Sequence, residues 1–351
     1  MNDLILIFFL IVFGLLFYKC FLLIMKKCNS KLLIDNQLRK PQAFHVSATP
    51  IIGGIGIFFS LIIVLFYFYL FKDILFFEYL SFCSLFFFLG FVDDIRINFN
   101  PKVRLILMIV LLALLVKYNN FYLEYTGISF LNSWMRNSDF FSLIFICLCF
   151  LFVTNGANLI DGYNGLLGIH SLIILANLFF VNYLNENSDL ALLLFFGILT
   201  LINFLIFNFP KAKVFLGDGG AYFLGAFIAV SVIKTSIAIP TISPFYFCIL
   251  LFYLFFEVFY SFFRKLIVEK ASPLHPDKKH LHMLLYKFLL RKNKNKVKSN
   301  YYVSIIINFF YFILTIPAIF MMNNGMFCKF YSIIFFLIYF FSYKIAYEKV
   351  K

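Results

Sequence analysis

Residues 4–25 read LILIFFLIVFGLLFYKCFLLIM, an apolar run whose one charged residue is Lys19. A helix needs about 20 mostly apolar residues to cross the hydrocarbon core of a bilayer, so this run predicts a transmembrane helix. It is too long for the apolar region of a cleavable signal, no basic segment precedes it, and no small-residue cleavage site follows it. We therefore expect it to be the first span of the chain.

Ten further apolar runs follow, and with the first they predict an all-α polytopic membrane protein with about eleven transmembrane helices. They lie at 51–71, 74–92, 103–116, 140–155, 165–184, 190–208, 221–239, 244–263, 302–322 and 326–343. Of the 351 residues, 63% are apolar and 13% are charged, against about half and about a quarter in soluble domains. This composition excludes a soluble enzyme with one core, and we expect residues 1–351 to form one integral membrane domain.

The basic residues indicate the orientation. If all the runs cross the membrane, 24 of the 30 Lys and Arg fall in loops on one side, 11 of them in the long loop 264–301. The positive-inside rule makes this side cytoplasmic, with the N-terminus outside and the C-terminus inside. The net charge of +14 is then a topology signal, so we expect no nucleic-acid binding. The seven Cys contain no C-x-x-C pair, which argues against a disulfide framework or a thiolate zinc site.

Two adjacent carboxylates, Asp93 and Asp94, lie at the cytoplasmic end of the third run. A helix C-terminus disfavours negative charge, so this position costs stability. The pair either ends the helix in a solvated loop or forms a cation or proton site, because adjacent carboxylates raise one pKa or attract Mg2+. Lys102 and Arg104, at the start of the next run, can hold an anionic partner at the interface.

Two glycine-containing segments lie on the same predicted side. Asn158 and Asp161 belong to a polar turn, where they are either ordinary turn residues or oxygen ligands. Asp218 lies between Gly217 and Gly219 just before a predicted helix. The glycine N–H groups at that helix start would suit a diphosphate, and Asp218 would suit its Mg2+. The alternative is that Asp218 only caps the helix.

Three of the five histidines, His275, His280 and His282, lie within one short stretch of the loop 264–301. No Cys or Glu close by completes a tetrahedral zinc set, so hydrogen bonding to phosphate oxygens fits these side chains better than zinc does. Apolar residues then recur at helical spacing among Lys and Arg. We expect an amphipathic helix here, lying on an anionic membrane face. Its apolar positions are Leu281, Leu284, Leu285, Phe288 and Leu289.

The first cytoplasmic loop contains Arg39 and Lys40, which topology determination alone explains, followed by His45. Gly53 and Gly54 start the second run, where glycine permits close helix packing.

Taken in order, these segments resemble the polyprenyl-phosphate N-acetylhexosamine-1-phosphate transferase superfamily, membrane enzymes that load a sugar phosphate onto undecaprenyl phosphate. The similarity covers about residues 35 to 285 and includes the eleven-span layout. Each segment alone is only modest evidence for the family, but the five together in this order are specific for it. They are His45 with Thr49-Pro50 and Gly53-Gly54, Gly90 to Asp94, Asn158 to Leu166, Phe215 to Gly220 with Leu224-Gly225, and His275 to His282.

This resemblance implies that a HexNAc-1-phosphate passes from a UDP-sugar to undecaprenyl phosphate with release of UMP. The step would initiate a cell-envelope glycan such as O-antigen lipopolysaccharide, capsule or teichoic acid. The enzyme would lie in the inner (cytoplasmic) membrane with its active site on the cytoplasmic face. A homodimer would be usual for such relatives. Mg2+, with Mn2+ as a substitute, would be bound by Asp94, Asp161 and Asp218. Asp93, Asp94 and Asp218 would be catalytic. The implied substrate-binding residues are His45, Lys102, Asn158, Asp161, His275, His280 and His282.

The last segment has the form H-x-D-x-x-H-x-H, which looks like the branch that uses UDP-N-acetylhexosamine. The peptidoglycan branch, which uses UDP-MurNAc-pentapeptide, instead has adjacent histidines there, and it remains an alternative. The chain departs from the family pattern at Asn164, where many members have Asp, and at Ala221, where Ser is usual. These departures leave a non-catalytic relative open. A transporter or lipid-linked glycan flippase fits less well, because among the charged residues only Lys19 and Glu257 lie more than five residues from both ends of a predicted span.

Overall fold

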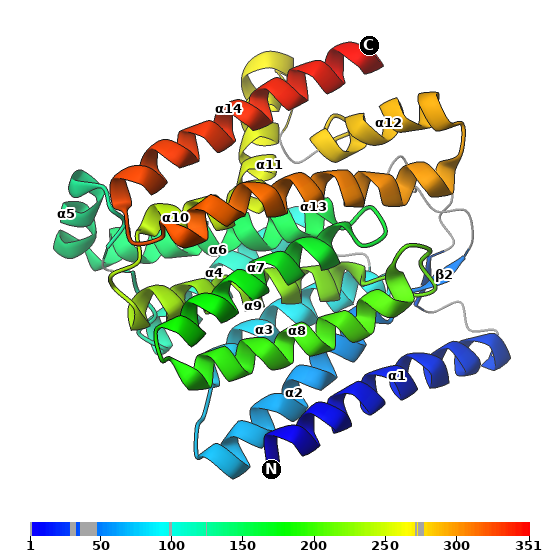
Figure 1. Cartoon of the computed structure of the whole chain (residues 1–351), viewed down its shortest axis with the longest axis horizontal. Coiled ribbons are helices and arrows are strands. Elements are labelled where there is room, and N and C mark those ends of the chain that lie inside the picture. Colours follow the sequence, from blue (N-terminus) through cyan, green and yellow to red (C-terminus); the bar gives the residue numbers. More distant parts are fainter. Residues whose placement is uncertain are drawn as a thin grey trace.

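The computed structural model describes residues 2–28, 33–35, 48–97, 100–123, 125–270, 272 and 277–351. In these ranges the chain is almost entirely helical, with one two-stranded antiparallel sheet, and the predicted all-α class is confirmed (Figure 1). The elements are α1 (Asn2–Cys28), β1 (Ile34–Asp35), β2 (Thr49–Pro50), α2 (Gly53–Lys72), α3 (Phe77–Asp94), α4 (Pro101–Tyr118), α5 (Ser129–Asn137), α6 (Asp139–Ile160), α7 (Leu166–Leu184), α8 (Ser188–Asn208), α9 (Gly217–Ala238), α10 (Pro244–Leu250), α11 (Phe252–Phe263), the π-helix η1 (Arg264–Glu269), α12 (Leu281–Asn293), α13 (Lys296–Phe320) and α14 (Gly325–Val350).

Each predicted apolar run coincides with helix. Among the described residues, 8 helices are long and apolar enough to cross a membrane, or 9 if the bent pair formed by α10 and α11 is one span. The helices α3 and α4 match the two remaining runs, but each has only 18 residues, and charged residues lie near both of its ends. The protein is therefore a multi-pass membrane protein, whereas the count of eleven and the outside N-terminus stay predictions.

Two local features differ from the sequence expectation. The run 244–263 is not one straight helix, because the chain bends by 74° between Pro244–Leu250 and Phe252–Glu269. The nine-residue helix α5, which no apolar run predicted, lies at the left edge of Figure 1, at the opposite end of the molecule from α12. Its exposed Phe130 and Trp134 suit a membrane interface, where amphipathic aromatic rings are enriched.

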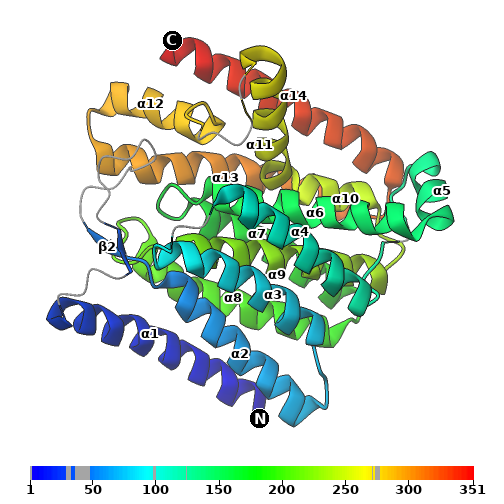
Figure 2. The same cartoon turned by 180° about the vertical axis from the view of Figure 1, so that it is seen from behind.

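The helix α9 forms the centre of the bundle. It packs against α2, α3, α6 and α7. Of the residues in its most apolar 18-residue stretch, 78% are buried inside the protein, against 22% for α1 and 17% for α14. Figures 1 and 2 show α1 and α14 at opposite edges. A Cβ added at Gly225 would lie 2.7 Å from Cα of Thr154, so α9 and α6 touch backbone to backbone. Small residues permit this close approach in membrane helices.

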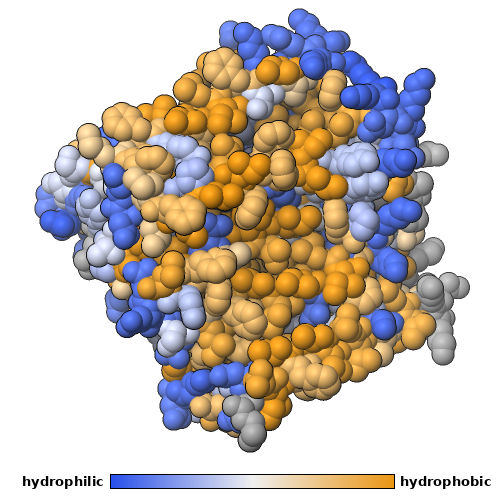
Figure 3. All heavy atoms as spheres, viewed as in Figure 1, coloured by the Kyte–Doolittle hydropathy of each residue, from blue (hydrophilic) through white to orange (hydrophobic). Residues whose placement is uncertain are grey.

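The surface carries a wide apolar band. Figure 3 shows orange side chains across the middle of the molecule, with blue side chains gathered toward its left and right ends. Phe8, Phe66 and Phe310 are each at least 60% exposed. An apolar surface of this extent is unusual for a soluble monomer and suits contact with lipid tails.

The predicted amphipathic helix is present as α12, but its apolar residues do not lie on a membrane face. They pack against α13 and α14, and Leu284 and Leu289 are buried. Arg291 donates hydrogen bonds to the carbonyl oxygens of Lys349, at 3.0 Å, and Val350, at 2.6 Å. The expectation was wrong because the same apolar spacing that suits a lipid surface also suits a protein groove.

Candidate active site

The segment from Phe215 to Gly220 lies directly against the start of α2. The N–H groups of Gly53 and Gly54 donate to the carbonyl oxygens of Phe215 and Leu216, each at 2.8 Å. A Cβ added at Gly54 would lie 2.5 Å from the backbone N of Gly220. Real Cβ atoms do not come this close to backbone atoms, so the contact requires glycine here.

The same segment touches the end of α3. A Cβ added at Gly90 would lie 2.4 Å from the carbonyl oxygen of Asp218. Gly217, which begins α9, has a φ of 83°, a left-handed conformation that glycine adopts without strain. These glycines bring three helix ends together around Asp218.

Asp94 caps α9 across this contact. Its Oδ1 accepts the N–H of Asp218 at 2.8 Å, and its Oδ2 accepts the N–H of Gly219 at 2.9 Å. A carboxylate at a helix N-terminus is stabilised by the helix dipole, which offsets its unfavourable place at the end of α3. Two expectations change. The Gly219 N–H, expected to bind a diphosphate, is bonded to Asp94, and Asp94 rather than Asp218 supplies the cap.

Three carboxylates gather at this point. Asn158 Nδ2 donates to Asp218 Oδ1 at 3.0 Å and so orients that side chain. Asp161 follows the last residue of α6, and burial together with the charges of Asp218 and Asp94 raises its pKa well above the usual value. The charges of Asp94, Asp161 and Asp218, which we call the carboxylate cluster, therefore repel one another and favour a bound cation.

Asp93, the neighbour of Asp94, forms an ion pair with Arg104 of α4. The Arg104 Cζ also lies 5.7 Å from the centroid of the Tyr222 ring, one turn beyond Asp218 in α9. Lys102 is exposed, and its backbone N–H is capped by Asn100 Oδ1 at 3.0 Å. Of the two basic residues singled out in this segment, Arg104 is therefore the one that meets Asp93.

Asn164, which departs from the pattern of the similar family, makes two hydrogen bonds to other segments. The Asn164 Nδ2 donates to the carbonyl oxygen of Pro210 at 3.0 Å, and its backbone N–H donates to Asn300 Oδ1 at 2.9 Å. An ionised Asp could not make the first bond, since a carboxylate has no donor. Ala221 is fully buried in α9, where its methyl group is packed in the core.

The histidines of the last segment lie in a buried polar group. His280 and His282 are 4% and 0% exposed, next to Glu257, which is 1% exposed. The Nδ1 atom of His280 lies 3.0 Å from Glu257 Oε2, and the Nδ1 atom of His282 lies 3.3 Å from the Tyr253 hydroxyl. We call Glu257, His280 and His282 the histidine cluster.

Ion pairs fasten the loop that leads to these histidines. Arg264 pairs with Asp277 and with Glu269, and the Ser261 hydroxyl donates to Asp277 Oδ2 at 2.7 Å. Burial alone would raise the pKa of Asp277, but the charge of His280, the Ser261 hydrogen bond and the Arg264 charge together lower it to about 2. Asp277 is thus an anion that ties the loop to η1.

One aromatic residue connects the two clusters. The ring of Tyr163, two positions after Asp161, lies 5.7 Å from the His282 ring, centroid to centroid. The structure therefore brings Asp93, Asp94, Asn158, Asp161 and Asp218 to one end of the bundle, with the histidine cluster beside them. His45 and His275 lie outside the described residues.

Sequence reasoning gave too little weight to two of these residues. Glu257 had a visible signal, because a lone carboxylate in an apolar span is costly and seldom without a role. Arg104 was noted only as a neighbour of Lys102. Its contact with Tyr222 joins helices that are far apart in the sequence, so no local pattern could reveal it.

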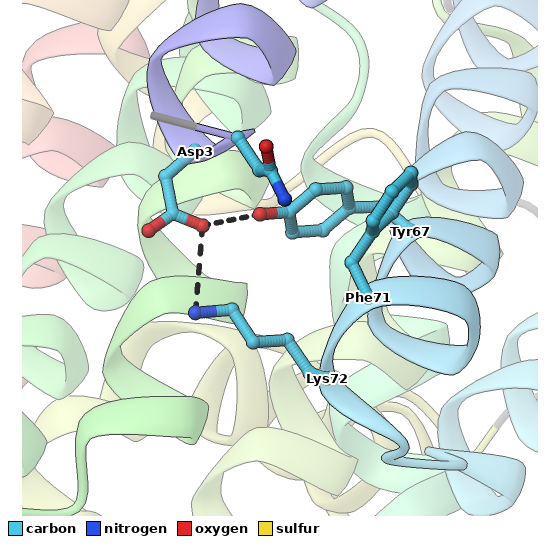
Figure 4. Close-up of a pocket in the computed structure, with 5 residues that line it drawn as sticks. Asp3, Tyr67, Phe71 and Lys72 are labelled. Atoms are coloured by element: carbon cyan, nitrogen blue, oxygen red, sulfur yellow. Dashed lines mark hydrogen bonds and ion pairs between the residues drawn. The ribbon is translucent and has the colours of Figure 1, made fainter.

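A separate pocket lies at the far end of α2. Asp3 Oδ1 accepts a hydrogen bond from the Tyr67 hydroxyl at 2.5 Å and lies 3.6 Å from Lys72 Nζ (Figure 4). Phe71 also lines the pocket. The 20 residues of α2 span about 30 Å at 1.5 Å per residue, which separates this pocket from Gly53 and the carboxylate cluster.

The chain is similar in sequence to known proteins. The family described as glycosyl transferase family 4 matches residues 76–236, a range that includes the carboxylate cluster. A phospho-N-acetylmuramoyl-pentapeptide-transferase of Dictyoglomus turgidum is 35% identical over 66% of this chain and 75% of its own length. An undecaprenyl-phosphate alpha-N-acetylglucosaminyl 1-phosphate transferase of Thermotoga maritima is 29% identical over 68% of both chains. A phospho-N-acetylmuramoyl-pentapeptide-transferase of Dictyoglomus thermophilum is 31% identical over 66% of this chain and 74% of its own length.

Proposed function

Because the chain belongs to glycosyl transferase family 4, the polyprenyl-phosphate N-acetylhexosamine-1-phosphate transferase superfamily, we propose that it transfers a HexNAc-1-phosphate from a UDP-sugar to undecaprenyl phosphate. Membership makes the chain a membrane phosphosugar transferase. We propose in addition that the donor is a UDP-HexNAc, that the acceptor is undecaprenyl phosphate, and that the reaction is the first step in making a cell-envelope glycan.

The carboxylate cluster at the start of α9 is the observation that carries this proposal. In the reaction, an oxygen of the lipid phosphate bonds to the β-phosphorus of the UDP-sugar, and the bond from that phosphorus to the bridging oxygen breaks to release UMP. Such a transfer depends mainly on positioning and charge neutralisation. The cluster supplies fixed oxygen ligands, and Arg104 supplies a fixed positive charge beside them.

The donor set fits Mg2+. Carboxylate oxygens are its preferred protein ligands, and the ion usually binds one or two carboxylates together with substrate phosphates and water. In the described part of the chain, no three His, Cys, Asp or Glu side chains already form a metal cage. We propose that Asp218, Asp161 and Asp94 hold Mg2+, with Mn2+ as a substitute. When bound, the ion would neutralise charge on the diphosphate.

The protein's own residues then have separate tasks. Asn158 orients Asp218 through the 3.0 Å hydrogen bond. We assign Asp93 the task of accepting a proton from, or orienting, the lipid phosphate, with Arg104 holding its carboxylate in place. Lys102, exposed at the start of α4, would attract the lipid phosphate. We place His45, His275, His280 and His282 on the side of the donor nucleotide.

A second candidate differs only in the donor. Two of the relatives are phospho-N-acetylmuramoyl-pentapeptide-transferases, and one of them is the relative with 35% identity. The spacing of His275, His280 and His282 instead favours a HexNAc donor, so we place the MurNAc-pentapeptide second.

A donor panel separates the two candidates. Purified protein is incubated with undecaprenyl phosphate, Mg2+ and either UDP-GlcNAc, UDP-GalNAc or UDP-MurNAc-pentapeptide, and mass spectrometry identifies the lipid product. We expect a lipid-diphosphate-HexNAc and UMP. A product formed only from UDP-MurNAc-pentapeptide would select the second candidate, and no product from any UDP-sugar would reject both.

Variants test the site itself. We expect Asp218→Ala and Asp93→Asn to abolish UMP release, and chelation of divalent ions to stop the wild type until Mg2+ or Mn2+ is returned. Asp73→Asn is the matched control, because Asp73 caps the other end of α2 with a φ of 55°, which Asn also adopts readily. Unchanged turnover in Asp218→Ala would remove its assigned role.

The location completes the proposal. We place the protein in the inner membrane, with the carboxylate cluster at the cytoplasmic face and a homodimer as its assembly. Single cysteines introduced near Asp35 and near Trp134, in a chain whose native cysteines are replaced, should react with a membrane-impermeant maleimide from opposite sides. Labelling of both from the same side would overturn this orientation.

A further inference from the structure

Glu257 is a buried carboxylate in α11, an otherwise apolar and aromatic helix. An unpaired charge in such a place costs several kcal/mol, so a residue of this kind normally has a dedicated partner. We propose that Glu257 is a positioning residue that fixes His280 and His282 for binding of the donor nucleotide. This proposal rests on the proposed function and adds a residue that no sequence motif marked.

Both carboxylate oxygens of Glu257 are used on the same short segment. The Oε2 atom lies 3.0 Å from His280 Nδ1, and the Oε1 atom accepts the N–H of Leu281 at 3.2 Å. Leu281 is the first residue of α12, and the His280 side chain provides no cap of its own. Glu257 therefore fixes the histidine ring and stabilises the N-terminus of α12 at once.

The contact also selects the state of the His280 ring. Because Nδ1 donates to Glu257, Nε2 is the atom that faces away from it, 3.6 Å from Asp277 Oδ2. The Glu257 carboxylate therefore fixes the proton on Nδ1 and the direction of the ring. Replacing the carboxylate by an amide would remove the negative charge that this N–H faces.

His282 is held through the same carboxylate. Its ring lies parallel to the His280 ring at 5.4 Å, and its Nδ1 lies 3.8 Å from Glu257 Oε1. Its buried Nε2 has no hydrogen-bond partner among the described residues. Buried polar atoms nearly always have a partner, so this nitrogen is available to a ligand next to Tyr163.

The neighbouring charges do not replace Glu257. Arg264 and Lys279 are both paired with Glu269, and Arg264 also with Asp277. Among the described side chains, Glu257 is the carboxylate that contacts both histidines.

The test is a double-mutant cycle in the full-length protein. UMP release is measured for Glu257→Gln, His280→Asn and the double variant, with separate titrations of the UDP-sugar and the lipid phosphate. A hydrogen bond to a charged group accounts for about 10- to 100-fold in an equilibrium or rate. We expect Glu257→Gln to reduce kcat/KM for the UDP-sugar by about that factor and to change the KM for lipid by less than about threefold. Because Glu257 also contacts His282 and the Leu281 N–H, the double variant should lose more than His280→Asn alone but less than the product of the two single losses.

Glu78→Gln is the matched control. Glu78 pairs with Lys234 at 2.8 Å near the start of α3, away from the histidine cluster. This variant should keep wild-type kinetics. If Glu257→Gln does not fold, Glu257→Asp keeps the charge on a shorter side chain and should give the same preferential loss for the UDP-sugar.

Two results would overturn the proposal: wild-type kcat/KM in Glu257→Gln, or losses that multiply in the double variant. Failure of the proposed function gives a different result, namely a wild-type protein that releases no UMP from any donor. In that case hydrogen exchange at the Leu281 amide still tests the contact. Faster exchange in Glu257→Leu, which has no acceptor, supports it, and equal exchange overturns it.

Discussion

Replacement of Gly90 by alanine adds one methyl group and should nonetheless disable the site. The new Cβ would lie 2.4 Å from the carbonyl oxygen of Asp218 and 2.6 Å from the N of Gly219. An ordinary contact is about 3.4 Å or more, so the start of α9 must move by about 1 Å. Overpacking of this kind costs about 1–3 kcal/mol. A shift of about 1 Å in reacting groups can cost about 100-fold in rate. Helix propensity alone would favour Ala over Gly, so a loss cannot come from α3 itself.

The assay compares UMP release and the thermal midpoint of Gly90→Ala with those of Gly162→Ala. Gly162 lies in the turn after Asp161, and a Cβ added there would meet nothing within 4 Å. We expect about a 100-fold loss of turnover and a lower midpoint for Gly90→Ala, with little change for Gly162→Ala. Wild-type turnover in Gly90→Ala would refute the inference that this backbone contact builds the site.

Arg104→Lys keeps the charge but loses the planar group over Tyr222; since a cation–π contact is worth about 0.5–2 kcal/mol, the free energy of unfolding should fall by up to that amount, and lipid-dependent turnover should fall about 3- to 30-fold. Asn164→Asp removes the donor to Pro210, so we expect it to lower stability by about 0.5–1.5 kcal/mol rather than to raise activity, as chemical denaturation would show. Burial lowers the pKa of His282 to about 4, below about 6.5 in the unfolded chain. The unfolded chain then takes up this proton first, so stability should fall from about pH 6.5 to about pH 4. The fall should be shallower in His282→Gln, and an identical pH profile in thermal unfolding would contradict this.

The transmembrane helices could be predicted because a bilayer-crossing helix needs a long apolar run, and such runs are explicit in the sequence. The bend at Leu251 could not, because apolar residues continue through it without glycine at that point. The helix α5 was missed because nine amphipathic residues give no run of that length.

The site was predictable as a set of segments but not as a set of contacts. Asp94, Asp161 and Asp218 stood out as acids beside turns and helix ends. That Asp94 caps α9 depends on the contact of Gly90 with Asp218, which exists only after α3 and α9 have packed. The same applies to Glu257, whose histidine partners lie 23 and 25 positions later in the chain.

The bonds from Arg291 to the last turn of α14 have a genetic consequence. A premature stop codon that removed Lys349 and Val350 would delete both acceptors. The C-terminal end of α12 would then lose the hydrogen bonds of Arg291 to α14. Such a truncation leaves every acidic side chain of the catalytic region intact, yet its effect would reach the chemistry through a loosened helix.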